Sequence, residues 1–314
     1  MIRIERYTPA WADRWDELLD RTATATFMHR RAYMDYHADR FEDCSLLALD
    51  GERLMAVLPA CRRDTVAASH AGLTYGGLHC DLRHTDAAIV LRVMEAMVEW
   101  LRTEGFKSLV YKPVPYIYHR YTADDDLYAL SRLGATLTAS ALSQAIVLRE
   151  PLPFDRGNKS GVNHALRQGV AVERGGDFRD FWPILEQVLM ERHSLRPVHT
   201  VEEMELLHGR FPREIELWTA RHSGNVVAGV VMYYAGPVAH AQYISASSQG
   251  RELKALPLLF SRLIAEARER GFRYFDFGVS TEDGGRFLNE GLMEQKSRMG
   301  GRGVLYNTYT LMFN

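Results

Sequence analysis

The chain has 314 residues, of which 46% are hydrophobic and 25% charged, and its formal net charge is -2. This is the composition of a folded globular protein of about two domains, without the basic excess that accompanies DNA binding. No stretch approaches ~18 consecutive apolar residues and the first residues lack an apolar signal-peptide core, so we expect neither a transmembrane helix nor export.

Strand and helix patterns alternate along the chain, which favours an α/β fold with a mixed, α+β type of sheet. The first half predicts, in order, a strand at 2–7, a helix at 9–20, a hairpin at 45–60 turning at Asp50-Gly51, a helix at 86–104 and a strand from 107. The second half predicts a helix at 178–193, a hairpin at 216–234 turning at Ser223-Gly224, a strand at 239–247, a helix at 253–270 and a strand at 273–280.

The two halves also share sequence. Residues 101–111 (LRTEGFKSLVY) match 267–277 (ARERGFRYFDF), and SRLGA at 131–135 matches SRMGG at 297–301. Both matches have the same offset of 166 residues, which indicates an internal duplication. We therefore expect two tandem domains, 1–155 and 156–314, joined by a segment rich in Pro, Gly and polar residues.

Cysteines and histidines give no sign of a metal site. The three cysteines are widely spaced, and the twelve histidines show no HExxH spacing. Neither pattern predicts a disulfide framework or a bound metal, and a reducing, cytoplasmic location fits this cysteine usage.

Copies of one fold share a core, so function is expected where they diverge. The offset pairs Asp276 with Val110, Gly278 with Lys112, and Lys296 with Leu130. Lys296 shares a helical face with apolar neighbours, so its ammonium must either find an anion or carbonyl or reach the surface along that face.

Asp276 lies in the aromatic strand RYFDFGVS, which has the pattern of a strand covered on both faces. Its carboxylate could act as a base, orient another group, or bind backbone N–H groups. Gly278 either lets the chain approach a ligand or opens a loop.

Two further positions suggest binding or proton transfer. Gln249, Gly250 and Arg251 precede a helix and could offer N–H groups to a phosphate, although a polar turn before a helix is common. Tyr243 could donate a proton to a leaving group or could be a buried structural tyrosine.

The stretches at 26–41, 56–60, 72–77 and above all 274–301 resemble the Fem-type branch of the GCN5-related acetyltransferase (GNAT) superfamily, over about 20–310. The resemblance implies tandem acetyltransferase-like domains. Well-known Fem members transfer an amino acid from aminoacyl-tRNA to a peptidoglycan precursor, and other branches are described as acyl-CoA-dependent N-acyltransferases of the cell envelope. The family's lysine falls on Lys296, and its acid-and-glycine segment on Asp276 and Gly278.

Two departures bear on the donor. The long coiled-coil arm of many tRNA-dependent members is absent, and the superfamily's CoA loop, (Q/R)xxGx(G/A), is only partly matched by residues 247–255. We expect an N-acyltransferase that uses acyl-CoA and an amine of a small molecule or envelope precursor. Lys296 would stabilise the oxyanion, Asp276 would be base or orienting group, and Tyr243 the acid. The alternatives are an aminoacyl-tRNA-dependent peptidyltransferase and a non-catalytic binding module.

Overall fold

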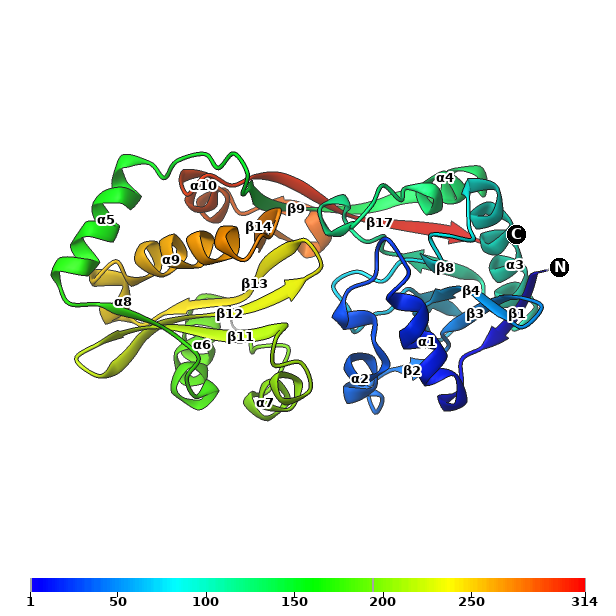
Figure 1. The fold of residues 1–314 in the computed structure, drawn as a ribbon, viewed down its shortest axis with the longest axis horizontal. Coiled ribbons are helices and arrows are strands. Elements are labelled where there is room, and N and C mark those ends of the chain that lie inside the picture. The colour runs from blue at the N-terminus through cyan, green and yellow to red at the C-terminus, as the bar shows by residue number, and fades with distance from the viewer. Residues whose placement is uncertain (1, 194, 314) are drawn as a thin grey trace. The chain divides into compact units, whose positions relative to one another are not determined.

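A computed structural model describes residues 2–193 and 195–313, and the chain divides into two compact units (Figure 1). The first unit comprises Met1–Leu142, Thr281–Phe287 and Leu305–Asn314, and the second comprises Ser143–Ser280 and Leu288–Val304. This division differs from the expected boundary after residue 155, because short segments from each half of the sequence belong to the unit built mainly by the other half.

The first unit has a sheet with the strand order β1-β3-β4-β7 and a second series of paired strands with the order β2-β5-β6-β8-β17-β9. The long helix α3 packs its apolar side chains, among them Val93 and Met97, against a core that includes Leu46 and Leu109. Its elements are β1 (Ile2–Arg6), α1 (Ala12–Leu19), α2 (Arg31–Met34), β2 (Glu42–Asp43), β3 (Leu46–Asp50), β4 (Arg53–Leu58), β5 (Cys61–Arg63), β6 (Val66–Ala68), β7 (His79–Cys80), α3 (Ala87–Thr103), β8 (Ser108–Tyr111), α4 (Asp125–Arg132) and β9 (Thr136–Val147).

The second unit is one mixed sheet with the order β10-β11-β12-β13-β14-β9. Helices α5 and α9 cover one face of this sheet, and α6 and α7 lie on the other (Figure 1). The remaining elements of the chain are α5 (Arg156–Arg167), β10 (Ala171–Arg174), α6 (Phe178–His193), α7 (Val201–Arg210), β11 (Ile215–His222), β12 (Asn225–Ala235), β13 (Val238–Ala246), α8 (Ser248–Glu252), α9 (Ala255–Glu269), β14 (Tyr274–Val279), β15 (Thr281–Glu282), β16 (Phe287–Leu288), α10 (Glu290–Arg298) and β17 (Arg302–Met312).

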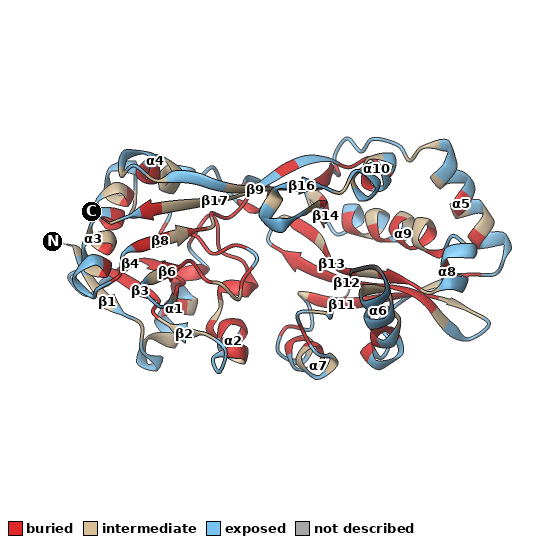
Figure 2. Cartoon of the chain, turned by 180° about the vertical axis from the view of Figure 1, so that it is seen from behind, coloured by how far each residue is buried: buried red, intermediate tan, exposed pale blue. Residues whose placement is uncertain are grey.

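Local sequence explains the central strands of this unit. Ser223 and Gly224 both have positive φ, 50° and 82°, as a tight two-residue hairpin turn requires, so β11 and β12 pair as predicted. Strands β12 and β13 are buried over most of their length (Figure 2), and Phe275 and Phe277 of β14 pack on Phe260 of α9. The sheet is therefore a rigid support for any group at the strand ends.

The two units repeat one arrangement. In the first, β6 runs parallel to β8, which pairs with β17 on its other side; in the second, β13 runs parallel to β14, which pairs with β9. Strand β17 comes from the second copy in the sequence and β9 from the first, so each copy supplies a strand that pairs within the other's unit. This common topology agrees with the internal duplication and with the expected tandem arrangement of mixed α/β type.

Among residues 2–193 and 195–313, no helix combines the length and apolar character that crossing a bilayer demands.

Candidate functional site

The parallel strands β13 and β14 part from one another soon after they meet. They pair at only three positions, the last of which joins His240 to Asp276, whereas β13 continues to Ala246. Parallel strands that separate leave unpaired backbone groups and room for a ligand at their carboxyl ends. The residues around this point are therefore the first place to look for chemistry.

The first unit closes the equivalent point with its own backbone. Strands β6 and β8 also pair over three positions, ending at Ala68 and Val110. Beyond them, the N–H of Ser69 donates to Val110 and the N–H of Gly76 donates to Lys112, at 2.9 and 3.0 Å. A loop of the chain thus occupies the gap between these strands in the first unit. This favours the second unit as the location of the active site.

Asp276 is the centre of a buried polar cluster. Its side chain is 0% exposed, and Oδ1 accepts hydrogen bonds from Ser143 Oγ at 2.6 Å and from the Gly278 N–H at 3.2 Å. Its Oδ2 lies 2.8 Å from Nδ1 of His240, whose side chain is 13% exposed. The Asp276 carboxylate is therefore fully buried and held in place by polar contacts with Ser143, Gly278 and His240.

Gly278 makes this cluster possible. Its φ of 78° is a conformation that favours glycine, and it turns the N–H back toward Asp276. A Cβ at this position would lie 3.5 Å from Cε1 of His240. The glycine therefore shapes the end of β14 next to the histidine.

Lys296 is buried on α10 and reaches the same strand end. Its Nζ donates to the carbonyl oxygens of Gly278 and Val279 at 2.8 and 2.7 Å. Burial lowers the pKa of Lys296 to about 8, an effect that the charge of Asp276 opposes. Leu130, its counterpart in the first copy, is likewise buried, so the second copy holds a cation where the first holds a core residue.

Tyr243 is also buried, three residues beyond His240 on β13. Its hydroxyl lies 2.6 Å from Nδ1 of His199 and accepts a hydrogen bond from the His199 N–H at 3.3 Å. Trp182 of α6 packs edge-on against the Tyr243 ring. The tyrosine therefore belongs to a hydrogen-bonded pair on the face of the sheet that α6 covers.

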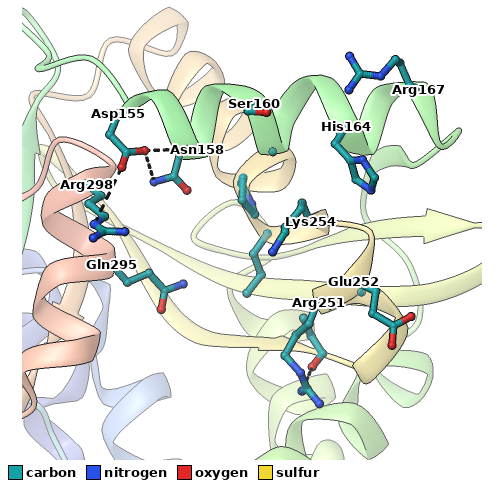
Figure 3. A pocket seen from close by; sticks show the side chains of 16 residues that line it. Asp155, Asn158, Ser160, His164, Arg167, Arg251, Glu252, Lys254, Gln295 and Arg298 are labelled. Atoms are coloured by element: carbon teal, nitrogen blue, oxygen red, sulfur yellow. Dashed lines mark hydrogen bonds and ion pairs between the residues drawn. The ribbon is translucent and has the colours of Figure 1, made fainter.

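A cavity of about 760 Å³ lies between α5, α8, the start of α9 and α10 (Figure 3). This is the size of a typical small-ligand pocket. The His164 side chain points from α5 toward the segment that joins α8 to α9 (Figure 3). Ala246, the last residue of β13, also lines the cavity. Four cationic side chains and two carboxylates line it: Arg167, Arg251, Lys254, Arg298, Asp155 and Glu252.

The turn at Gln249, Gly250 and Arg251, which was expected to offer backbone N–H groups to a phosphate, uses two of these amides within helix α8. The N–H of Gly250 donates to Ser247 Oγ and that of Arg251 donates to the Ser247 carbonyl, so both amides serve helix α8. A Cβ on Gly250 would lie 2.1 Å from the carbonyl oxygen of Val227, so the glycine is required for packing on β12. Gly250 and Arg251 line the cavity, whereas Gln249 is absent from its wall and lies 3.4 Å from His222.

The structure thus gathers Asp276, Gly278 and Lys296 at one strand end and places Tyr243 further along β13. Sequence reasoning missed His240 and His199, which contact Asp276 and Tyr243 respectively. No group of three or more His, Cys, Asp or Glu side chains within the described ranges is placed to hold a metal ion.

Residues 157–284 match the family described as "Acetyltransferase (GNAT) domain". This part of the chain is a GNAT domain. The GNAT match covers the parallel pair β13 and β14, helices α5 to α9 and most of the residues discussed above. No curated protein gives a significant sequence match.

Solved structures extend the likeness to the whole chain. The structure of FemX has a TM-score of 0.71 at 13% identity, covering 99% of this chain and 98% of that one. The C-terminal domain of a putative lysylphosphatidylglycerol synthetase from Agrobacterium fabrum has a TM-score of 0.62 at 14% identity, over 96% and 90%. A tandem GNAT protein from the clavulanic acid biosynthesis pathway has a TM-score of 0.55 at 13% identity, over 99% and 98%.

The family match over residues 157–284 supports an acyltransferase domain of the GNAT type, and the solved structures show that the whole chain has a tandem GNAT-like fold. At these identities the solved structures establish the fold, and the donor and acceptor have to be argued from this chain's own residues.

Proposed function

We propose that the chain is an N-acyltransferase that moves an acyl group from acyl-CoA to an amine of a small molecule or cell-envelope precursor. The observation that supports acyl-CoA as the donor is the cationic cavity at the end of β13. Its lining carries four cations against two carboxylates, an excess that suits the phosphate groups of CoA.

Arg167 and Lys254 are the cations best suited to hold phosphate. Arg298 is already near Asp155 and Glu294, and the Arg251 guanidinium donates to Ala246 and Ser248. Lys254 has a φ of 55°, a left-handed conformation that is uncommon for a residue with a long side chain. In this chain, side-chain cations therefore take over the role that loop amides were predicted to have.

The transfer itself would occur where β13 and β14 separate. An amine that attacks an acyl carbonyl needs a group to take its proton and a charge to stabilise the oxyanion. Lys296 supplies a buried cation at the end of β14, and Asp276 fixes the groups around it. Tyr243, paired with His199, remains our proposal for the proton donor to the leaving group.

A second donor, aminoacyl-tRNA, is favoured by a different observation. The exposed cations Arg156, Lys159 and Arg167 lie along α5 and could contact a phosphate backbone. Such binding would weaken steeply as salt concentration rises. The acceptor class, an envelope precursor, is proposed from the Fem-type resemblance.

Thermal unfolding of the purified protein with acetyl-CoA, longer acyl-CoAs and charged or uncharged tRNA tests the donor. A ligand present at 100 times its Kd stabilises the native state by about 2.7 kcal/mol. We expect stabilisation by acyl-CoA that is lost in R167A/K254A and kept in R262A, a matched change of an exposed cation on α9. Stabilisation by charged tRNA alone would replace the CoA donor, and binding of acyl-CoA without turnover would indicate a binding module.

A further inference from the structure

We infer that His240 is the catalytic base of the transfer, with Asp276 and Ser143 as the residues that position it. The inference rests on the proposed acyl transfer to an amine and adds the group that removes the proton from that amine.

The geometry first fixes which nitrogen of His240 carries the hydrogen. A carboxylate can only accept, so the 2.8 Å contact between Oδ2 of Asp276 and Nδ1 of His240 places a hydrogen on Nδ1. The neutral ring then carries its lone pair on Nε2. The carboxylate cannot turn away, because its Oδ1 is held by Ser143 Oγ at 2.6 Å and by the Gly278 N–H.

Accessibility separates the roles of the two side chains. Asp276 is 0% exposed, whereas His240 keeps 13% of its side-chain surface accessible. Asp276 therefore acts only through the histidine. His240 also stands at the last position where β13 and β14 pair, so its ring lies where the strands begin to separate.

The duplication provides an internal comparison. The strand pair of the first unit ends at Ala68 and Val110, the positions equivalent to His240 and Asp276. The same fold is thus built with two apolar residues, and the strand pair has no structural need of a buried acid. Burying a carboxylate is costly unless it is fully hydrogen-bonded, which points to selection for chemistry in the second copy.

The step balances in protons and bonds. Nε2 of His240 takes one proton from the acceptor's ammonium group and releases it to water. The neutral amine then attacks the thioester carbonyl, and a C–N bond forms. Nε2 takes a second proton from the attached nitrogen, and Tyr243 donates a proton to the leaving thiolate as the C–S bond breaks. The tyrosine recovers a proton from the histidine through solvent, so the products are the amide, the thiol and one proton.

Labelling with diethyl pyrocarbonate tests His240 without reference to donor or acceptor. The reagent ethoxycarbonylates unprotonated imidazole nitrogen, and peptide mass spectrometry reports the rate at each histidine. We expect His240 to react at least ten times faster in the wild type than in D276N, where an amide can donate to Nδ1 and leave the hydrogen on Nε2. His84, which lies 3.0 Å from Asp81 in the first unit, should react equally in both.

Turnover is then measured as thiol release from acetyl-CoA with glucosamine as the probe amine. We expect H240Q to lower kcat at least 100-fold with KM for acetyl-CoA within twofold, and D276N to lower kcat about tenfold or more. H240A/D276V, which installs the residues of the first copy, should melt as a folded protein and be inactive. H84Q, the matched change in the first unit, should keep wild-type turnover.

Wild-type turnover in H240Q, or equal labelling of His240 in wild type and D276N, would overturn the inference. If the wild type releases no thiol, the proposed donor fails, and the labelling result alone decides on His240. Fast labelling that depends on Asp276 then supports it, and slow labelling rejects it.

Discussion

The pKa of Lys296 leads to a prediction that isolates one buried charge. The pKa of the folded protein's lysine is about 8 against an ordinary 10.5, because burial disfavours the ammonium form. Between these two values the unfolded chain binds a proton that the folded chain does not. The lysine therefore lowers the free energy of unfolding at neutral pH, and this penalty shrinks as the pH rises toward 10.5.

The two pKa values give a penalty on the order of 3 kcal/mol at pH 7 and about 1 kcal/mol at pH 9.5. Replacing Lys296 by methionine keeps the length of the side chain and removes the charge. It also leaves two carbonyl oxygens without their donor, a loss that does not depend on pH. The stability of K296M relative to wild type should therefore fall by about 2 kcal/mol between pH 7 and pH 9.5.

Urea unfolding of both proteins at the two pH values measures this difference. Other groups that titrate in this range contribute equally to both proteins and cancel. A difference in stability that is the same at pH 7 and pH 9.5 would show that Lys296 is not held in a desolvated site and would remove it from the buried cluster described here.

Three further predictions follow from the packing. G250A should destabilise by more than about 2 kcal/mol, because its Cβ would lie 2.1 Å from a backbone oxygen, whereas G209A on α7 meets open space and should gain roughly 0.5–1 kcal/mol; thermal melts compare them. Burial lowers the pKa of His29 to about 4, so between pH 7 and pH 5 the protein should lose about 2 kcal/mol that H29N does not lose; urea titrations that show parallel losses would contradict this. A fragment ending at residue 155 lacks β17 and should show no cooperative melt in circular dichroism, and a sharp transition would disprove its dependence on that strand.

Local signals in the sequence predicted the secondary structure well. The residue types at Ser223 and Gly224 predicted a hairpin turn with positive φ, and the structure has the turn at these two residues. The repeat was found because residues around β8 and β14 keep one offset, and that offset also led to the contrast between Leu130 and Lys296.

The pairing of strands that are distant in the sequence could not be predicted from local sequence signals. His240 corresponds to Ala68 in the structure, an offset of 172 residues, whereas Asp276 and Val110 keep the offset of 166. The segment between the two parallel strands differs in length between the copies. A constant offset of 166 residues therefore does not align His240 with its counterpart Ala68. The domain boundary was missed for a similar reason, since nothing local indicates that β9 and β17 pair outside their own copies.

The swapped position of β17 has a consequence for how the protein is made. Strand β17 leaves the ribosome about 200 residues after β8, with which it pairs in the first unit. Until β17 has emerged, β8 presents an open edge of the kind that recruits other chains. The first unit must therefore wait for β17, and chaperone protection of that edge during translation would govern the yield of native protein.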